Sequence, residues 1–351
     1  MTLRQLIHCC LFAPVMVQAN CNIPDFIAKD KINAYLAETG QSCSNDKSMN
    51  DKAVYMTDNR FDVYLAEGAI KQAARSTAAL ILKVNLIKQG NEYISRLEGI
   101  TQENGMDACV SERFSQQPVL SNCSAFLVDE NILVTAGHCF KGDGAFPIED
   151  YYVVFGYEMK SKSQAQLRFP LQDVYTIAKE LEVRKSMSPR EDWAVVQLDR
   201  TVKDRQIFEF SQAEIQKGTG LTMFGYPNGL PLKIADGGKV LENQHGKNVF
   251  ATDVDAFKGN SGSPILNSAA LKLTPPRYIV EGILVSGAID AVKKNGCYKV
   301  EPCQTVNISY NHIGKCTSEI ITKINRVLVS EPEINPEPSS NFQQNVIQNF
   351  F

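Results

Sequence analysis

Three short motifs carry side chains that could perform nucleophilic chemistry, and the last of them contains a candidate nucleophile. Ser261 lies within the stretch Gly259-Asn-Ser-Gly-Ser-Pro264. A turn this tight can expose a hydroxyl group and direct successive backbone N–H groups at one point, which suits a nucleophile whose attack creates an oxyanion. A run of glycine, serine and asparagine is also typical of an ordinary turn. The serine therefore needs partners before a chemical role can be assigned to it.

Two candidate partners precede the serine in the chain. His138 follows the apolar run 131–137, and Asp192 opens a second apolar run. A histidine can take the proton from Ser261, and an aspartate can fix the histidine tautomer and stabilise the imidazolium. Taken alone, His138 could be a buried core histidine, and Asp192 could cap a strand or pair with Arg190. Together the three residues predict a His-Asp-Ser triad.

These motifs resemble the three catalytic boxes of the trypsin/chymotrypsin family, in the order in which that family carries them. The matching segments are Thr135-Ala-Gly-His-Cys139, Asp192-Trp-Ala and Gly259-Asn-Ser-Gly-Ser-Pro264. The last box is most similar to bacterial members, including glutamyl endopeptidases. The nucleophile elbow of α/β-hydrolases is disfavoured, because Ser263 occupies its last glycine position and those enzymes have the order Ser, acid, His.

The resemblance implies peptide-bond hydrolysis, with protein or peptide substrates as partners. Ser261 would be the nucleophile, His138 the general base and then the general acid, and Asp192 the residue that orients His138. The backbone N–H groups of Gly259 and Ser261 would form the oxyanion hole. Asn260 stands where activated animal proteases carry an aspartate that pairs with a newly cut N-terminus, so the site is expected to be preformed.

The resemblance also suggests how substrate is bound. The segment Val285-Ser286-Gly287 is similar to the strand that pairs with the substrate backbone. Asp255 lies six residues before Ser261, where trypsin-like enzymes carry the acid that binds arginine or lysine. This position predicts cleavage after basic residues, although Asp255 could instead cap a strand. A glutamate preference is disfavoured, because Val285 stands where glutamyl endopeptidases carry a histidine.

Two other functions remain compatible with these motifs. A non-catalytic binding protein could use the same fold, and an esterase could use the same triad. Binding proteins of this kind usually lose a triad residue, whereas His138, Asp192 and Ser261 are all present. An active serine endopeptidase is therefore the preferred interpretation.

The elements that must position these residues are predicted to be mostly β-strands. Short segments rich in β-branched and aromatic residues recur between Gly, Pro, Asn and Asp, which is typical of an all-β sandwich or barrel. The family resemblance refines this to two six-stranded antiparallel β-barrels, with the triad in the cleft between them. A C-terminal α-helix is also predicted, because apolar residues repeat at helical spacing behind two good caps: Thr317, Ser318, Ile320, Ile321, Ile324, Val327 and Leu328.

The chain is predicted to have four parts. Residues 1–19 are typical of a secretory signal peptide, with a positive start, an apolar centre and a small-residue cleavage site. Residues 20–52 form a preface, or a propeptide-like segment, with a weak helical stripe. Residues 53–330 contain the protease domain, and residues 331–351 form a polar tail that is expected to be disordered. The mature protein is expected to be secreted or periplasmic.

Composition limits the partners and the redox chemistry. A net charge of −3 gives no reason to expect nucleic acid, and no segment after the leader is long and apolar enough to span a membrane. No cofactor or metal is expected, since Cys-x-x-Cys and His-rich pairings are missing. Eight cysteines follow the leader, and an even number in an exported chain suggests disulfides: Cys21, Cys43, Cys109, Cys123, Cys139, Cys297, Cys303 and Cys316. The family resemblance implies a Cys123–Cys139 bond around the histidine loop. Cys21–Cys43 is a possible local pair, and Cys109 is expected to reach one of the last three.

Overall fold

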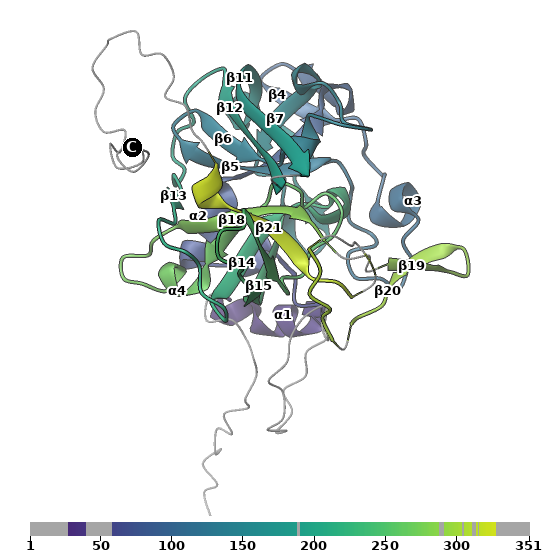
Figure 1. Cartoon of the computed structure of the whole chain (residues 1–351). Helices are drawn as coiled ribbons and strands as arrows, with labels where there is room; N and C mark the ends of the chain where they lie inside the picture. Colours follow the sequence, from purple (N-terminus) through teal and green to yellow (C-terminus); the bar gives the residue numbers. More distant parts are fainter. Residues whose placement is uncertain are drawn as a thin grey trace, which may run out of the picture.

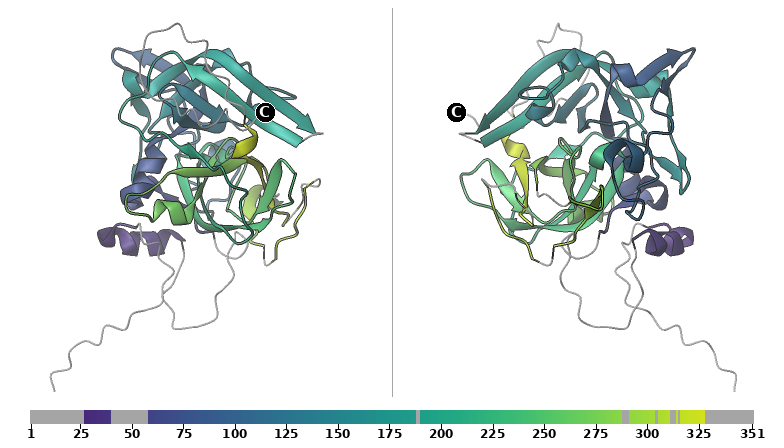
Figure 2. Two further views of the ribbon diagram at one scale, coloured as in Figure 1. Left: turned by 60° about the vertical axis from the view of Figure 1, so that its left-hand side comes forward. Right: turned by 90° about the vertical axis from the view of Figure 1, so that its right-hand side faces the viewer.

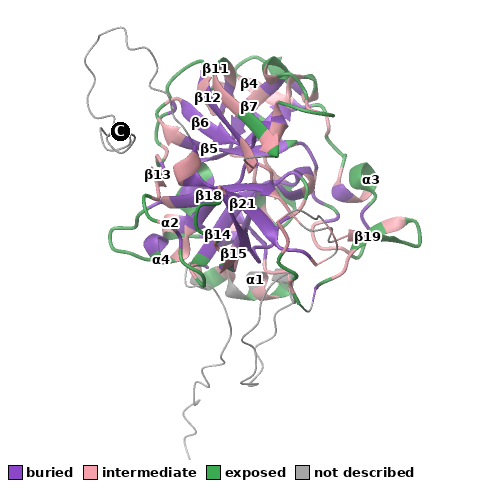
Figure 3. Ribbon diagram, in the orientation of Figure 1, coloured by how far each residue is buried: buried purple, intermediate pink, exposed green. Residues whose placement is uncertain are grey.

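Two β-barrels, packed one on the other, make up the body of the molecule (Figure 1). The computed structural model describes residues 27–39, 58–187, 190–287, 291–303, 305–310, 314 and 316–327. The strands of the two barrels are mostly buried, whereas exposed residues gather on the peripheral loops and hairpins (Figure 3). The predicted signal peptide and polar tail lie outside the described residues.

The first barrel is a closed ring of six strands in the order β11-β12-β6-β5-β2-β7, all paired antiparallel. Val134, Val153 and Phe155 are fully buried inside it, as expected for short β-branched and aromatic segments. Its strands are β2 (Thr77–Leu82), β5 (Cys123–Asp129), β6 (Ile132–Thr135), β7 (Tyr151–Phe155), β11 (Val174–Met187) and β12 (Arg190–Leu198).

The second barrel also closes with six strands, in the order β15-β14-β17-β18-β21-β16, because β16 pairs back with β15. Two short strands are attached to it: β1 (Phe61–Asp62) pairs with β15, and β13 (Glu209–Phe210) pairs with β18. Its own strands are β14 (Gly220–Gly225), β15 (Lys233–Glu242), β16 (Val249–Thr252), β17 (Pro264–Asn267), β18 (Ile279–Ser286) and β21 (Glu319–Lys323). The prediction of two six-stranded antiparallel barrels is confirmed.

The prediction of a C-terminal α-helix is wrong for the residues described. Glu319–Lys323 forms strand β21, and only a single 3₁₀ turn, Ile324–Arg326, follows it. β21 closes the second barrel between β16 and β18, and all five of its residues are buried. Ile320 and Ile321 lie side by side in this strand, and a short apolar run in a buried strand can also match helical spacing. Leu328 and the residues after it lie outside the described part.

The N-terminal preface contributes a short helix, as its apolar stripe predicted. Helix α1 (Ile32–Thr39) follows a 3₁₀ turn and lies beneath the second barrel (Figure 2). The preface is joined to the domain just before this helix. Ile27 is buried and forms an isolated β-bridge with Ala66, and the Ala28 N–H donates to Leu65 O at 3.1 Å. These contacts make part of the preface an integral piece of the fold.

The remaining elements are short and lie at the edges of the barrels. Among the described residues, no helix combines the length and the apolar composition that crossing a membrane requires. The helices are α2 (Gly68–Arg75), α3 (Gln102–Met106) and α4 (Ser268–Leu271). Three small sheets are formed by β3 (Leu86–Gln89), β4 (Glu92–Ser95) and β10 (Arg168–Pro170), by β8 (Met159–Ser161) and β9 (Gln164–Ala165), and by β19 (Ala291–Lys294) and β20 (Cys297–Val300).

Three disulfides join described cysteines: Cys109–Cys297, Cys123–Cys139 and Cys303–Cys316. The second confirms the bond expected around the histidine loop. The first confirms that Cys109 reaches a cysteine of the C-terminal region, and it fastens the segment before β5 to the β19–β20 hairpin. The predicted Cys21–Cys43 pair lies outside the described residues.

A buried ion pair fastens strand β1 to the second barrel. Lys233 and Asp62 both have side chains that are 1% exposed, and the lysine Nζ lies 2.5 Å from Asp62 Oδ1. Gln117 bridges them, accepting from Lys233 Nζ at 2.7 Å and donating to Asp62 Oδ2 at 2.9 Å. The network therefore holds together β1, the segment before β5 and β15.

Replacing Lys233 with methionine is expected to lower the free energy of unfolding by about 3–5 kcal/mol, because Asp62 would keep a buried charge without its ion partner. Denaturant unfolding followed by tryptophan fluorescence measures the change. Lys160→Met is the matched control: its pair with Glu158 has a lysine side chain that is 46% exposed, so its loss should cost less than about 1 kcal/mol. Equal losses in the two variants would contradict the expectation.

Candidate active site

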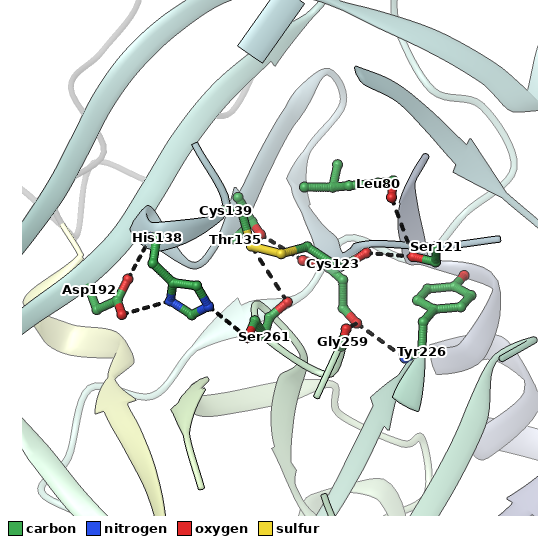
Figure 4. Close-up of a disulfide and its surroundings, with 11 residues drawn as sticks. Leu80, Ser121, Cys123, Thr135, His138, Cys139, Asp192, Tyr226, Gly259 and Ser261 are labelled. Carbon is green, nitrogen blue, oxygen red and sulfur yellow. Dashed lines mark hydrogen bonds and ion pairs between the residues drawn. A yellow bond between two sulfur atoms is a disulfide. The ribbon is translucent and has the colours of Figure 1, made fainter. Parts of the chain in front are cut away.

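The three predicted triad residues meet where the two barrels face each other (Figure 4). His138 lies in the 3₁₀ turn Gly137–Cys139 directly after β6, and Asp192 lies in β12 of the same barrel. Ser261 comes from the loop between β16 and β17 of the second barrel. The first barrel thus supplies the histidine and the aspartate, and the second supplies the serine, as the family resemblance implied.

The side chains form one continuous line of hydrogen bonds. His138 Nε2 lies 2.7 Å from Ser261 Oγ, and His138 Nδ1 lies 2.8 Å from Asp192 Oδ2. The other aspartate oxygen, Oδ1, accepts the backbone N–H of His138 at 2.8 Å. The carboxylate therefore holds both the ring and the main chain of the histidine. With Nδ1 protonated toward the aspartate, Nε2 is the acceptor that faces the serine hydroxyl.

The position of His138 is fixed by close packing in its own barrel. β6 pairs with β12 in a register that places Thr135 opposite Ala194, which brings the turn after β6 next to Asp192. A Cβ atom at Gly137 would overlap the carbonyl oxygen of Arg184, so the backbone passes there only because residue 137 is glycine. Cys139 is bonded to Cys123, so its sulfur is not a thiolate that could join His138 in binding a metal.

Arg190 lies two residues before Asp192 on β12, and its surroundings shift its pKa. Burial lowers the pKa of the Arg190 guanidinium, and the charge of Asp192 partly offsets that shift. The guanidinium also donates to the carbonyl oxygen of Tyr310. Arg190 is therefore held at the side of the triad by backbone from the second barrel's C-terminal region.

The loop before the nucleophile is a tight turn that needs glycine. The Asn260 N–H donates to Phe257 O at 3.1 Å, and Gly259, the third residue of this turn, has φ of +92°. A type II β-turn requires positive φ at its third residue, which glycine adopts without strain. The Asn228 N–H donates to Lys258 O at 2.5 Å. The Lys258 carbonyl and the Gly259 N–H belong to the same trans peptide bond and point in opposite directions. The Gly259 N–H therefore points away from Asn228.

Ser124, on β5, holds the next two peptides of this loop. Its hydroxyl donates to Gly259 O at 3.2 Å and accepts the Tyr226 N–H at 3.2 Å. Its backbone N–H donates to Ser261 O at 2.8 Å, and its own carbonyl oxygen would be overlapped by a Cβ atom at Gly262. Within the described residues, the N–H groups of Gly259 and Ser261 donate no hydrogen bond. Both predicted oxyanion donors are therefore available for a ligand.

Gly259→Ala is expected to lower kcat about 10²- to 10³-fold, the usual effect of losing one oxyanion donor. The alanine Cβ would lie 2.7 Å from Tyr226 O, and the positive φ disfavours any side chain, so the turn must reorganise. Steady-state hydrolysis of a fluorogenic peptide measures kcat. Gly246→Ala is the control, since its φ is +76° and its Cβ would meet no atom within 4 Å. An unchanged kcat in Gly259→Ala would contradict the expectation.

A cavity of about 180 Å³ opens directly beside the candidate nucleophile. Ser286 and Gly287, which were predicted to bind substrate, both line it, at the end of β18 and just after it. Its lining is Ala256, Phe257, Lys258, Ser261, Leu284, Ser286, Gly287 and Glu319. Glu319 was missed by the sequence interpretation because it lies at the start of the segment predicted to be helical.

Asp255, the predicted pocket acid, is not among the residues that line this cavity. Its carboxylate is buried, and Oδ2 accepts the backbone N–H of Asn59 at 2.9 Å. The carboxylate thus anchors the segment that leads into β1.

The aromatic wall of the cavity is supported by the same segment. The guanidinium of Arg60 lies 3.9 Å from the ring centroid of Phe257 and is itself paired with Asp58 at 2.8 Å. Burial alone would raise the pKa of Asp58, but two neighbouring guanidinium groups outweigh burial and lower it to about 2. The charge of Arg60 behind Phe257 is therefore balanced by the ionised carboxylate of Asp58. Contacts from the segment before β1 thus hold the Phe257 wall of the cavity in place.

Comparison with known protein families identifies the family of this chain. The family model for Trypsin matches residues 101–307, which is more than half of the chain. The protein therefore belongs to the trypsin family of serine proteases. It is similar to a solved structure of a Glu endopeptidase in complex with MPD, with 15% identity and a TM-score of 0.42 over 79% of this chain and 93% of that chain. A comparison with curated proteins gave no match.

Proposed function

We propose that this protein is an exported serine endopeptidase that cleaves peptide bonds through an acyl-enzyme formed on Ser261. The observation that supports this most directly is the unbroken hydrogen-bond line from Asp192 through His138 to Ser261, with contacts of 2.8 and 2.7 Å. A serine hydroxyl becomes an effective nucleophile when an oriented base can accept its proton. Family membership supports the same reaction class.

The proposed reaction proceeds in two halves. His138 Nε2 takes the proton from Ser261 Oγ as the oxygen bonds to the substrate carbonyl carbon, and it then gives that proton to the leaving amine. Water, deprotonated by the same nitrogen, attacks the acyl-enzyme, and the proton returns to Ser261 as the acid product leaves. Asp192 stabilises the imidazolium formed in each half without itself being protonated.

The proposed oxyanion hole consists of the N–H groups of Gly259 and Ser261. The turn at Gly259, held by Asn228 and Ser124, fixes these donors before substrate arrives. Such preorganised donors stabilise charge only as it develops, which is why they accelerate the chemical step. Asn228, in the turn after β14, and Ser124, on β5, make these contacts, which supports the expectation of a preformed site.

Substrate is proposed to bind as an extended peptide beside the end of β18, where Ser286 and Gly287 would pair with its backbone. The side chain preceding the cleaved bond would then enter the cavity next to Ser261. Cleavage after arginine or lysine is the specificity we propose, since the lining includes a carboxylate. Protein or peptide substrates are the expected partners.

Export is supported by the leader-like sequence of residues 1–19 and by the disulfides. Three bonds join described cysteines, and such bonds persist mainly in oxidising compartments. The mature protein would begin near residue 20 and be secreted or periplasmic. Residues 53–330 would form the catalytic domain.

Labelling with a neutral alkyl fluorophosphonate tests the proposed activity. The reagent should attach to Ser261 in folded protein comprising residues 20–351, and peptide mapping should locate it there. Cleavage of a folded-protein or peptide substrate library by the same preparation should accompany labelling. Ester turnover without peptide cleavage would indicate an esterase. Absence of both labelling and cleavage in a folded sample would favour the non-catalytic binding protein.

A further inference from the structure

Arg113 lies outside the strands of both barrels, in the segment 107–117 between α3 and β5. One terminal nitrogen of its guanidinium donates to the carbonyl oxygen of Asp58, and the other donates to that of Arg60, each at 2.5 Å. The first nitrogen also lies 3.0 Å from Asp58 Oδ1. The planar guanidinium therefore holds the backbone on both sides of Asn59, a geometry that the single nitrogen of a lysine does not offer.

The backbone that Arg113 holds contacts the loop before the candidate nucleophile at two places. The Asn59 N–H donates to Asp255 Oδ2 at 2.9 Å, and the Arg60 guanidinium lies 3.9 Å from the centroid of the Phe257 ring. Phe257 and the residue on each side of it line the cavity beside the nucleophile. A continuous set of contacts therefore runs from Arg113 to one wall of that cavity.

The segment that carries Arg113 is itself anchored on both sides of this residue. On the N-terminal side, the Cys109–Cys297 disulfide and the Cys109 N–H, which donates to Tyr298 O at 2.9 Å, fasten it to the hairpin β19–β20 (Figure 1). On the C-terminal side, Gln117 bridges the buried ion pair between β1 and β15. A support can hold a wall only if its own position is fixed, and these contacts fix it.

We propose that Arg113 is a positioning residue that sets the shape of the cavity beside Ser261, acting through the stretch 58–60 and Phe257. Arg113 is not among the residues that line the cavity, so it would act on substrate only through the wall. The inference rests on the proposed function, because this cavity is where the substrate residue before the cleaved bond is proposed to bind. Without the guanidinium, the wall would move more freely and would contact a bound side chain less closely.

Hydrogen–deuterium exchange of protein comprising residues 20–351 tests this support without requiring turnover. The Asn59 N–H donates to Asp255 Oδ2, and the Asn260 N–H, which lies beyond the wall in the chain, donates to Phe257 O at 3.1 Å. Arg113→Met removes both guanidinium donors, so exchange should become about 10-fold faster at Asn59 and about threefold faster at Asn260. Faster exchange at Asn59 alone, or at neither amide, would overturn the inference, because the effect would not reach the wall.

Arg205→Met is the matched control for this experiment. The Arg205 side chain is only 9% exposed, pairs with Asp173 and donates to Arg75 O at 2.5 Å, so its loss also removes the contacts of a buried guanidinium. Neither partner lines the cavity. The control should therefore leave exchange at Asn59 and Asn260 unchanged. A rise of the same size in both variants would indicate general loosening of the fold and would overturn the inference.

Arg113→Lys provides a second variant in case Arg113→Met does not fold. Lysine keeps the positive charge beside Asp58 but has one nitrogen in place of the two that reach the carbonyl groups. Exchange at Asn59 and Asn260 should therefore still become faster, by less than in Arg113→Met. Thermal unfolding shows whether each variant keeps the fold. If only Arg113→Lys folds and its exchange equals that of the wild type, the inference is wrong.

Turnover separates a positioning role from a purely structural one. Two fluorogenic peptides differ only in the residue before the cleaved bond: one has the large residue that wild-type protein cleaves best, and the other has alanine, which leaves most of the cavity empty. Arg113→Met should lower kcat/KM about 10-fold for the first peptide, mainly through a higher KM, and less than about threefold for the second. An equal fall for both peptides would mean that Arg113 only supports the fold, which would overturn the inference.

The two proposals can fail separately. If wild-type protein reacts with the neutral fluorophosphonate and cleaves peptides, but Arg113→Met changes neither the exchange at Asn260 nor the ratio of the two kcat/KM values, the peptidase proposal stands and the Arg113 inference is wrong. If wild-type protein is neither labelled nor active, the peptidase proposal is wrong, whereas faster exchange at Asn260 in Arg113→Met would still show that Arg113 holds the wall of the cavity.

Discussion

Replacing Ser261 with alanine is expected to lower kcat for peptide hydrolysis about 10⁶-fold, because the hydroxyl that forms the acyl-enzyme is lost. His138 would keep its contacts with Asp192 but would have no proton to accept at 2.7 Å. The His138→Ala variant should lose a similar factor, and the double variant should lose little more, since the two residues act as one unit. Single-turnover and steady-state hydrolysis of a fluorogenic peptide measure these rates.

Ser263→Ala is the matched control for that experiment. Ser263 lies in the same motif and is fully buried, and its hydroxyl has no hydrogen-bond partner within the described chain. Its removal should leave kcat within about threefold, because no hydrogen bond is lost. If Ser261→Ala retained more than about a tenth of wild-type kcat, another group would have to be the nucleophile.

The meeting of the triad residues could be predicted from the sequence because each motif carries its own local geometry. His138 follows an apolar strand, Asp192 opens another, and Ser261 lies in a glycine-rich turn, so each residue is placed by its neighbours in the chain. The family resemblance then supplied the long-range arrangement. The structure brings all three within hydrogen-bonding distance. Their catalytic roles remain the prediction that the variants test.

The lining of the cavity could not be predicted in the same way, since it depends on contacts between distant segments. Asp255 is turned toward Asn59, a residue 196 positions away in the chain, and nothing in the local motif indicates that hydrogen bond. Glu319 reaches the lining because β21 lies between β16 and β18. Position along the sequence led to Asp255 as the expected pocket acid, whereas tertiary packing places Glu319 in the lining of the cavity beside Ser261.

The C-terminal segment shows why periodicity alone was insufficient. Ile320, Ile321 and Ile324 match a helical face, but Glu319–Lys323 is a strand whose five residues are all buried, and periodicity alone cannot separate a short buried strand from a helical segment. Only closure of the second barrel distinguishes a strand from a helix here. Without β21, the strands β16 and β18 would each have an unpaired edge. The same misassignment hid Glu319, since a residue at the start of a surface helix would be expected to face solvent.

Asp192→Asn is expected to lower kcat about 10⁴-fold while leaving the fold and KM nearly unchanged. In the wild type, Asp192 Oδ1 accepts the His138 backbone N–H and Oδ2 faces Nδ1, both at 2.8 Å. The amide of asparagine must keep its oxygen toward the backbone N–H, so its NH₂ group would face Nδ1. That nitrogen would then have to accept, and the proton would move to Nε2.

A histidine with its proton on Nε2 cannot accept the hydroxyl proton of Ser261, so the variant would hold the base in the wrong tautomer. Hydrolysis of a fluorogenic peptide gives kcat and KM, and the rate of fluorophosphonate labelling should fall with kcat. Asp199→Asn is the control. Asp199 is an exposed aspartate that forms an ion pair with the neighbouring Arg200 and does not contact the triad. A loss below about tenfold in Asp192→Asn would show that the carboxylate does not set the histidine tautomer, and the triad mechanism would then need another partner for Nδ1.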